Sequence, residues 1–242
     1  DEGWKFFPKY LKVILKNFLG IGFLNDYTFQ GNNLTLKEKR DTLVISWAYK
    51  NNFNPDGSFT DTYLKENSKN HQNILWVAIS LDNYVPENLH KNVVIIKRKK
   101  RYLRFSMIFL LKTFFGSLIQ NKFSLKKIAH YLSSNSIIAF KINKIITKKI
   151  NIDNFSKILL PYEAQPFQNY LFDCLKKQKK NLKTIGYLHA VLPSVPINYL
   201  NRNGAPDLLL VHGQGQKDIL NELLGWPQNK TKLRQTQVVA FS

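Results

Sequence analysis

The sequence predicts an α/β fold built on a parallel sheet, and one stretch in the second half of the chain carries most of that prediction. Residues 158–160, 184–187 and 208–211 are short apolar runs bounded by Pro, Gly, Asn or Asp, the usual punctuation of strands. A helical pattern runs from Gln165 to about Lys180, between the first two runs. One strand, a helix and two further strands indicate βαβ connections, which pair strands in parallel.

Three earlier apolar runs predict the other half of the sheet. They lie within residues 41–50, 73–82 and 92–97, and the last two are nearly continuous, as expected of strands buried on both faces. Helical patterns over about 125–149 and 216–224 supply further crossovers, with a Ser- and Asn-rich break near 133–136. We therefore predict a Rossmann-like parallel sheet with helices on both faces.

The composition bounds the class of protein. The chain has 242 residues, of which 44% are hydrophobic, so it is long enough to bury a core. Its net charge of +20 favours an anionic partner such as nucleic acid, an anionic membrane or a phosphorylated ligand, although a Lys- and Asn-rich genome explains the same charge. The single cysteine, Cys174, excludes a disulfide within the chain and is expected to pack as a small apolar residue.

Two basic segments have an amphipathic or apolar body. Residues 4–24 form the first, which together with a loop to residue 40 precedes the sheet domain at 41–228. The second spans 97–121, where a basic run precedes an apolar helix that is too short to cross a bilayer. Both segments suit an anionic membrane surface, but helices packed on the domain explain them equally well. The membrane-surface residues predicted for the second segment are Lys97, Arg98, Lys99, Lys100, Arg101 and Arg104.

Titratable residues follow the strands of the C-terminal half directly. Glu163, His189 and His212 each come just after a strand, the last beside Gly213. The carboxyl ends of parallel strands share one edge, where ligands bind in open α/β sheets. An imidazole takes up protons near neutral pH, so His189 is a candidate general base and Glu163 a candidate partner or base. The alternatives are that Glu163 caps the following helix and that both histidines are structural.

A second polar loop follows the strand at 41–50. Asn54, Asp56 and Gly57 indicate a turn, and a helix is predicted to begin near Asp61. A helix N-terminus after a strand is a suitable place for an anion, while ordinary turn and cap chemistry is the alternative.

Several kinds of site are excluded by the sequence. It contains no phosphate-binding loop of the GxxxxGK[ST] type, no GxSxG nucleophile motif and no cluster with metal-ligand spacing. The glycines at 213 and 215 lack the third member of a dinucleotide fingerprint. No metal and no covalently bound cofactor is therefore expected.

Three strings resemble glycosyltransferases that build bacterial surface carbohydrates such as O-antigen, lipopolysaccharide and capsule, with the two-domain GT-B architecture. They read PYExQPF, GYxHxxxxxxPxNY and APDxxxVxG, and a loop containing Gly57, Asp61 and Tyr63 is similar to the loop after the first strand of that family. The matching residues are Pro161, Tyr162, Glu163, Gln165, Pro166, Gly186, Tyr187, His189, Pro196, Asn198, Tyr199, Pro206, Asp207, Val211 and Gly213.

The resemblance implies a nucleotide-sugar donor, a glycan or lipid-linked acceptor, and a cytoplasmic protein held on the inner face of the membrane. It implies His189 or Glu163 as the catalytic base. In that architecture the donor binds mainly to a second domain, so residues 229–242 would begin the crossover to it. The acceptor-binding residues that the resemblance implies are Gly57, Asp61, Asn198, His212 and Gly213.

Two other functions remain open at this point. The first is a non-catalytic basic protein that binds an anionic membrane or nucleic acid. The aromatic residues fall mostly in core-like patterns and do not alternate with basic ones, which disfavours nucleic acid. The second is another Rossmann-like enzyme such as an epimerase, for which the sequence shows no nucleotide site.

Overall fold

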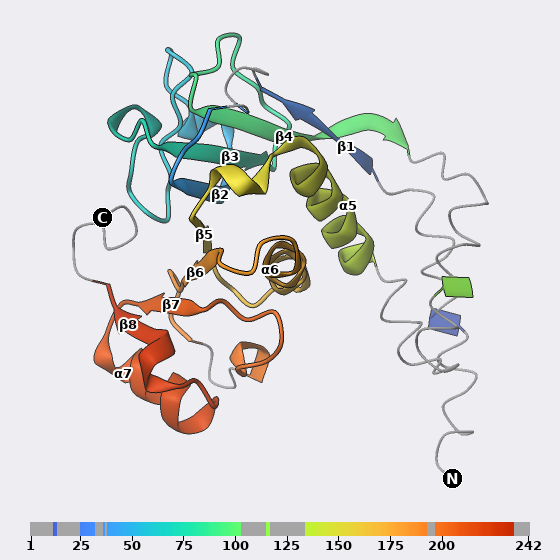
Figure 1. The fold of residues 1–242 in the computed structure, drawn as a ribbon. Coiled ribbons are helices and arrows are strands. Elements are labelled where there is room, and N and C mark those ends of the chain that lie inside the picture. Colours follow the sequence, from blue (N-terminus) through green and yellow to red (C-terminus); the bar gives the residue numbers. More distant parts are fainter. Residues whose placement is uncertain are drawn as a thin grey trace.

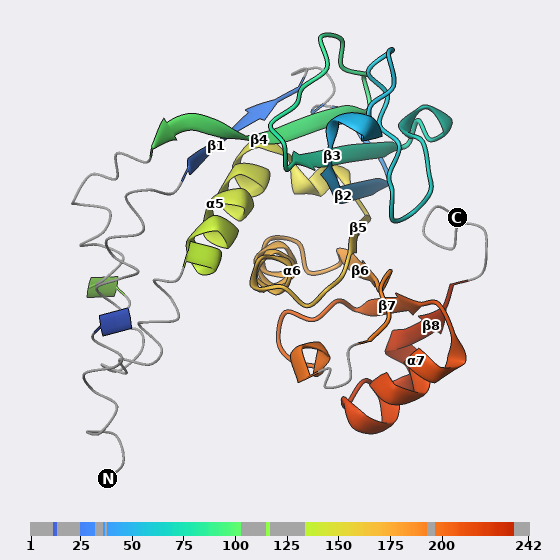
Figure 2. The same cartoon turned by 180° about the vertical axis from the view of Figure 1, so that it is seen from behind.

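The architecture is seen in a computed structural model of the chain (Figures 1 and 2). The structure describes residues 12–13, 25–31, 36, 38–102, 115–116, 134–192 and 197–234. The predicted helices at 4–24 and 105–121 therefore lie almost wholly outside the described residues, as do Arg104 and the first part of the predicted helix at 125–149.

A single eight-stranded sheet organises these residues, with the strand order β1-β4-β3-β2-β5-β6-β7-β8. Every neighbouring pair is parallel except β1 and β4. The α/β class and the parallel sheet are as predicted. The strands are β1 (Asn25–Gln30), β2 (Thr42–Ala48), β3 (Ile74–Ser80), β4 (Val93–Tyr102), β5 (Lys157–Pro161), β6 (Lys183–Tyr187), β7 (Leu208–Val211) and β8 (Thr231–Leu233).

The order of the parallel strands reverses once, between β2 and β5. From β2 the chain proceeds outward through β3 to β4, then returns and proceeds in the other direction through β5, β6, β7 and β8. Such a topological switch point leaves a crevice outside the carboxyl ends of the two central strands, and this is where doubly wound sheets bind ligands. Here those ends are followed by Tyr49 and by Tyr162-Glu163.

The two faces of the sheet are covered differently. Right-handed crossovers in opposite directions place connections on opposite faces. On one face, α5 (Ser134–Lys149), α6 (Pro166–Gln178) and the turn after α7 (Gln214–Asp218) bury side chains in a common core; α5 and α6 lie side by side there (Figures 1 and 2). On the other, the connections that follow β2 and β3 cover the sheet with loops, and within the described residues no α-helix joins the second core.

The two strands in the middle of the sheet are almost completely buried. All seven residues of β3 and six of the seven residues of β2 are buried, because these strands lie in the middle of the sheet with side chains packed on both faces. Trp76 is the largest fully buried side chain, and it packs against the ring of Phe59 from the loop after β2. Phe59 therefore anchors the loop after β2 in the core, and this fixes the position of the turn that follows Phe59.

Several elements depart from the sequence prediction. Residues 26–30 were expected in a loop but pair as β1 along the edge of the sheet, and β4 runs to Tyr102, beyond the predicted end at residue 97. No helix begins at Asp61: residues 62–64 form a turn, and Lys65 has a φ of 60°. Strand β8 pairs with β7, so the sheet extends past the predicted boundary at residue 228.

Short helical segments complete the described structure. The helix predicted at 216–224 is α7 followed by a π-helical turn at Ile219–Leu223, and Gly225 ends it with a φ of 67°, as expected of a glycine after a helix. The 3₁₀ turns lie at Lys50–Asn52, Ser68–Asn70, Ile152–Asn154, Ile197–Tyr199 and Gln228–Lys230.

Candidate functional site

The loop after β5 is shaped by one buried side chain, Gln168. Its Oε1 accepts hydrogen bonds from the backbone N–H groups of Glu163 (2.9 Å) and Gln165 (3.0 Å), and its Nε2 donates to the Pro161 carbonyl (2.6 Å). Gln168 is 1% exposed and sits in the first turn of α6, where Pro166 occupies the first helical position without needing an N–H partner. The amide thus holds the loop in a fixed shape and places the Glu163 side chain at the carboxyl edge of the sheet, which we call the rim.

Glu163 and His189 meet across the ends of β5 and β6. The distance between Glu163 Oε1 and His189 Nε2 is 3.1 Å, and Gln165 Nε2 donates to Glu163 Oε2 at 2.6 Å. The contact becomes an ion pair when His189 is protonated. The two predicted catalytic residues are therefore brought together.

The pair presents its carboxylate outward and its imidazole inward. The Glu163 side chain is 32% exposed and the His189 side chain 18%, and among the described residues His189 Nδ1 is buried with no hydrogen-bond partner. Burial holds the pKa of His189 below its ordinary value, reinforced by the nearby His212 and opposed by the charges of Glu163 and Asp61. At neutral pH the imidazole is therefore mainly uncharged.

His212 belongs to a neighbouring network at the ends of β6, β7 and β8. Its Nε2 lies 2.9 Å from the Tyr187 hydroxyl and 3.2 Å from the His189 carbonyl. Arg234 donates to the same hydroxyl and lies over the Tyr187 ring, 4.7 Å from its centroid. His212 thus contacts the backbone of His189, and its ring holds the strand ends together.

Asp61 lies in the turn after β2, without contact with solvent. Its side chain is fully buried, and Oδ1 accepts the N–H groups of Tyr63 (2.8 Å) and Leu64 (2.6 Å). Burial raises the pKa of Asp61 above its ordinary value, while the Ser46 hydroxyl, these two N–H groups and His189 oppose the rise. A residue with no exposed surface cannot contact an acceptor directly, so the acceptor-binding role predicted for Asp61 does not fit its place in this structure.

The other predicted acceptor-binding residues are spread along the loops. Gly57 forms the predicted turn with a φ of 76°, and a Cβ there would lie 1.8 Å from the Asn88 carbonyl oxygen, so the position is structural. Asn198 lies in the 3₁₀ turn after β6, where its carbonyl accepts from Arg202 (3.2 Å). Gly213 precedes α7 with open space around its Cα. None of these three residues has a described contact with the Glu163–His189 pair.

Five of the six predicted membrane-surface residues, Lys97 to Arg101, lie on β4. Lys97, Arg98 and Lys99 continue the strand beyond its buried part, and the side chains of Arg98 and Lys99 are exposed. The backbone of this part pairs with the edge strand β1. Lys100 and Arg101 belong to the same strand.

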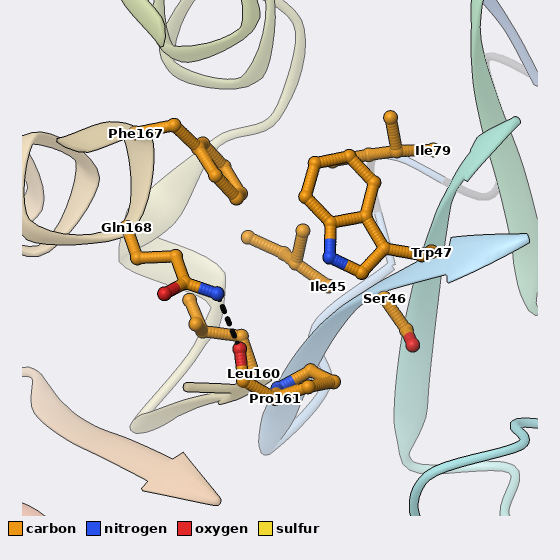
Figure 3. Close-up of a pocket in the computed structure, with 8 residues that line it drawn as sticks. All are labelled: Ile45, Ser46, Trp47, Ile79, Leu160, Pro161, Phe167 and Gln168. Atoms are coloured by element: carbon orange, nitrogen blue, oxygen red, sulfur yellow. Dashed lines mark hydrogen bonds between the residues drawn. The ribbon is translucent and has the colours of Figure 1, made fainter. Parts of the chain in front are cut away.

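An apolar recess lies at the switch point, on the face covered by α6 (Figure 3). Side chains from β2, β3, β5 and α6 line the recess, and the Trp47 and Phe167 rings meet edge to face at 5.4 Å. The recess is too narrow to hold a water molecule, so it is a packing gap beneath the rim and not a ligand site. Its lining consists of Ile45, Ser46, Trp47, Ile79, Leu160, Pro161, Phe167 and Gln168.

Three residues at the site escaped the sequence reasoning as functional candidates. Gln168 and Arg234 give no chemical signal of their own, since their importance comes from backbone groups that the fold brings to them. Tyr63 entered only through the family resemblance, and its ring packs against that of His189 with centroids 4.3 Å apart.

Comparisons with known proteins found no match, so the function is inferred from the geometry of the site. The sequence gives no significant match to any protein-family model or to any curated protein. Within the described residues, no group of three His, Cys, Asp or Glu side chains is arranged to hold a metal ion, and no helix of that part combines the length and apolar character needed to cross a bilayer.

Proposed function

We propose that this chain provides the acceptor side of a glycosyltransferase that acts on a surface-polysaccharide or lipopolysaccharide precursor. The observation that carries the proposal is the 3.1 Å pair of Glu163 and His189 at the carboxyl edge of a sheet with a topological switch point. The strings that resemble surface-carbohydrate glycosyltransferases contain both residues of the pair.

The reaction that we assign to the site joins an acceptor hydroxyl oxygen to the anomeric carbon of a nucleotide sugar. The hydroxyl proton passes to Glu163, the bond between the anomeric carbon and the phosphate oxygen breaks, and the nucleotide leaves with that electron pair. We assign proton removal to Glu163 because its side chain is the more exposed member of the pair. Gln165 donates to Oε2 and His189 Nε2 lies 3.1 Å from Oε1, and since a carboxylate oxygen accepts more than one hydrogen bond, both oxygens keep a position for the acceptor.

The test is oligosaccharide binding by the full chain. A glycan array of bacterial surface oligosaccharides, followed by titration of the best ligands, is expected to find binding that falls about tenfold or more in Glu163→Gln, since a hydrogen bond to a charged group is lost. Glu222→Gln, an exposed carboxylate on the turn after α7, is the matched control and keeps wild-type affinity. Absence of glycan binding together with strong, salt-sensitive binding of any oligonucleotide contradicts the proposal and favours a polyanion-binding protein.

Peripheral attachment to an anionic membrane is the second part of the proposal. Arg98 and Lys99 are exposed on the part of β4 that pairs with the edge strand β1, and each basic residue near an anionic surface contributes about 1 kcal/mol. Vesicles that contain phosphatidylglycerol are expected to retain the chain in flotation, and Arg98→Glu/Lys99→Glu is expected to weaken retention. Equal retention by neutral vesicles would contradict an electrostatic attachment.

A further inference from the structure

The turn after β2 contains a carboxylate that a simple turn does not require. An aspartate that only accepts backbone N–H groups normally lies at the surface, because an ionised group in the interior costs free energy unless it is paired. Asp61 makes these turn contacts with Oδ1 but is fully buried, and its Oδ2 makes no well-formed hydrogen bond among the described residues, the Ser46 hydroxyl being the uncharged side-chain group that acts on it. Asparagine would accept the same N–H groups without the cost of burying a charge.

The buried carboxylate acts on His189 electrostatically. The charge of Asp61 favours the protonated imidazole, and the charge of a protonated His189 lowers the pKa of Asp61 in return. His189 Nδ1, the nitrogen that does not face Glu163, is itself buried and has no hydrogen-bond partner among the described residues. Protonation of His189 therefore offsets part of the cost of burying the Asp61 charge.

The same carboxylate fixes the aromatic contact to the imidazole. By accepting the Tyr63 and Leu64 N–H groups, Asp61 holds the turn that packs the Tyr63 ring edge to face with His189. Arg234 donates to the Leu64 carbonyl at 3.0 Å, so the turn is also tied to the end of β8. The contact thus depends on groups from three separate parts of the chain.

We propose that Asp61 is a positioning residue for His189, acting on it through its charge and through the Tyr63 ring. The inference rests on the proposed function, because His189 matters there as the partner of Glu163, the assigned base. The groups that face His189 are Glu163 from the loop after β5, Asp61 and Tyr63 from the turn after β2, and His212 from the end of β7. Asp61 and Glu163 favour the imidazolium, whereas His212 disfavours it.

The experiment is an NMR titration of the His189 ring in the full chain. Asp61→Asn keeps the shape and the acceptor oxygen but removes the charge, and it is expected to lower the pKa of His189. Asp173→Asn, a surface carboxylate on α6 that pairs with Lys177, is the matched control and is expected to leave the titration unchanged. A folded Asp61→Asn variant with an unchanged His189 titration would overturn the proposal and reduce Asp61 to a turn residue.

A second measurement covers the case in which Asp61→Asn does not fold. Glu163→Gln removes the other carboxylate that faces His189. The chemical shift of the His189 ring should then show two inflections with pH, one from the ring itself and a second at acidic pH as Asp61 takes up a proton. A single inflection would overturn the proposal. Both titrations are independent of glycan binding, so a response of His189 to Asp61 in a chain that binds no glycan would keep the positioning role and reject the proposed function.

Discussion

Replacing Gln168 with leucine is expected to destabilise the protein and to disorganise the rim of the site. The side chain makes hydrogen bonds of 2.6, 2.9 and 3.0 Å to Pro161, Gln165 and Glu163, and it is 1% exposed. Leucine has a similar volume but pairs with none of these backbone groups. At about 1 kcal/mol for each of the three hydrogen bonds, with a further cost for the groups left unpaired, the loss is about 3–5 kcal/mol.

The assay is urea unfolding followed by the fluorescence of the four tryptophans. A lower midpoint with an unchanged slope is expected, because the variant buries nearly the same surface. Gln178→Leu is the matched control: Gln178 is exposed on the same helix, so its replacement should change stability by no more than about 0.5 kcal/mol. If Gln168→Leu is as stable as this control, the amide does not hold the loop and the reasoning about the rim is wrong.

Three further predictions concern other parts of the fold. Gly57→Ala should cost about 2 kcal/mol or more in urea unfolding, because a Cβ meets the Asn88 carbonyl at a positive φ. Asp207→Ala should lower stability by about 1–2 kcal/mol, since it removes bonds to Thr184 and an ion pair of 2.6 Å to Lys176 that is only partly screened. The pKa of His189 is depressed in the folded state. As the pH falls below about 6.5, the unfolded chain takes up this proton before the folded chain does, so the free energy of unfolding should decrease, and it should decrease less in His189→Gln.

The sheet was predictable because its central strands are buried on both faces. Residues 74–80 are apolar or small throughout, and no helix of ordinary length explains so short a run between turn residues. Strand β1 could not be found in this way, since Asn25–Gln30 is mostly polar and lies at an edge, where it pairs with β4 and only Tyr27 and Phe29 pack against the core. Its pairing partner, β4, lies far along the chain, so the local sequence pattern cannot predict the pairing.

The candidate site shows the same division between local and long-range information. Glu163 and His189 were predictable as neighbours because each follows a strand, and adjacent parallel strands end at one edge. The burial of Asp61 was not predictable, because Asp-Thr-Tyr-Leu resembles the start of a helix and only the packing of its loop onto β2 and β3 reverses that interpretation. Arg234 donates a hydrogen bond to the Leu64 carbonyl, 170 residues away in the sequence, and no rule based on residue spacing predicts such a contact.

The most direct test of the proposed function is to locate a bound oligosaccharide by the changes it causes in backbone amide resonances of the full chain. The account predicts that the largest changes occur at Glu163, Gln165 and His189 and in the turn containing Tyr63, and that Glu163→Gln abolishes them at the same ligand concentration. Changes confined to the basic part of β4, with the rim unaffected, would contradict the account and make the chain a basic binding protein.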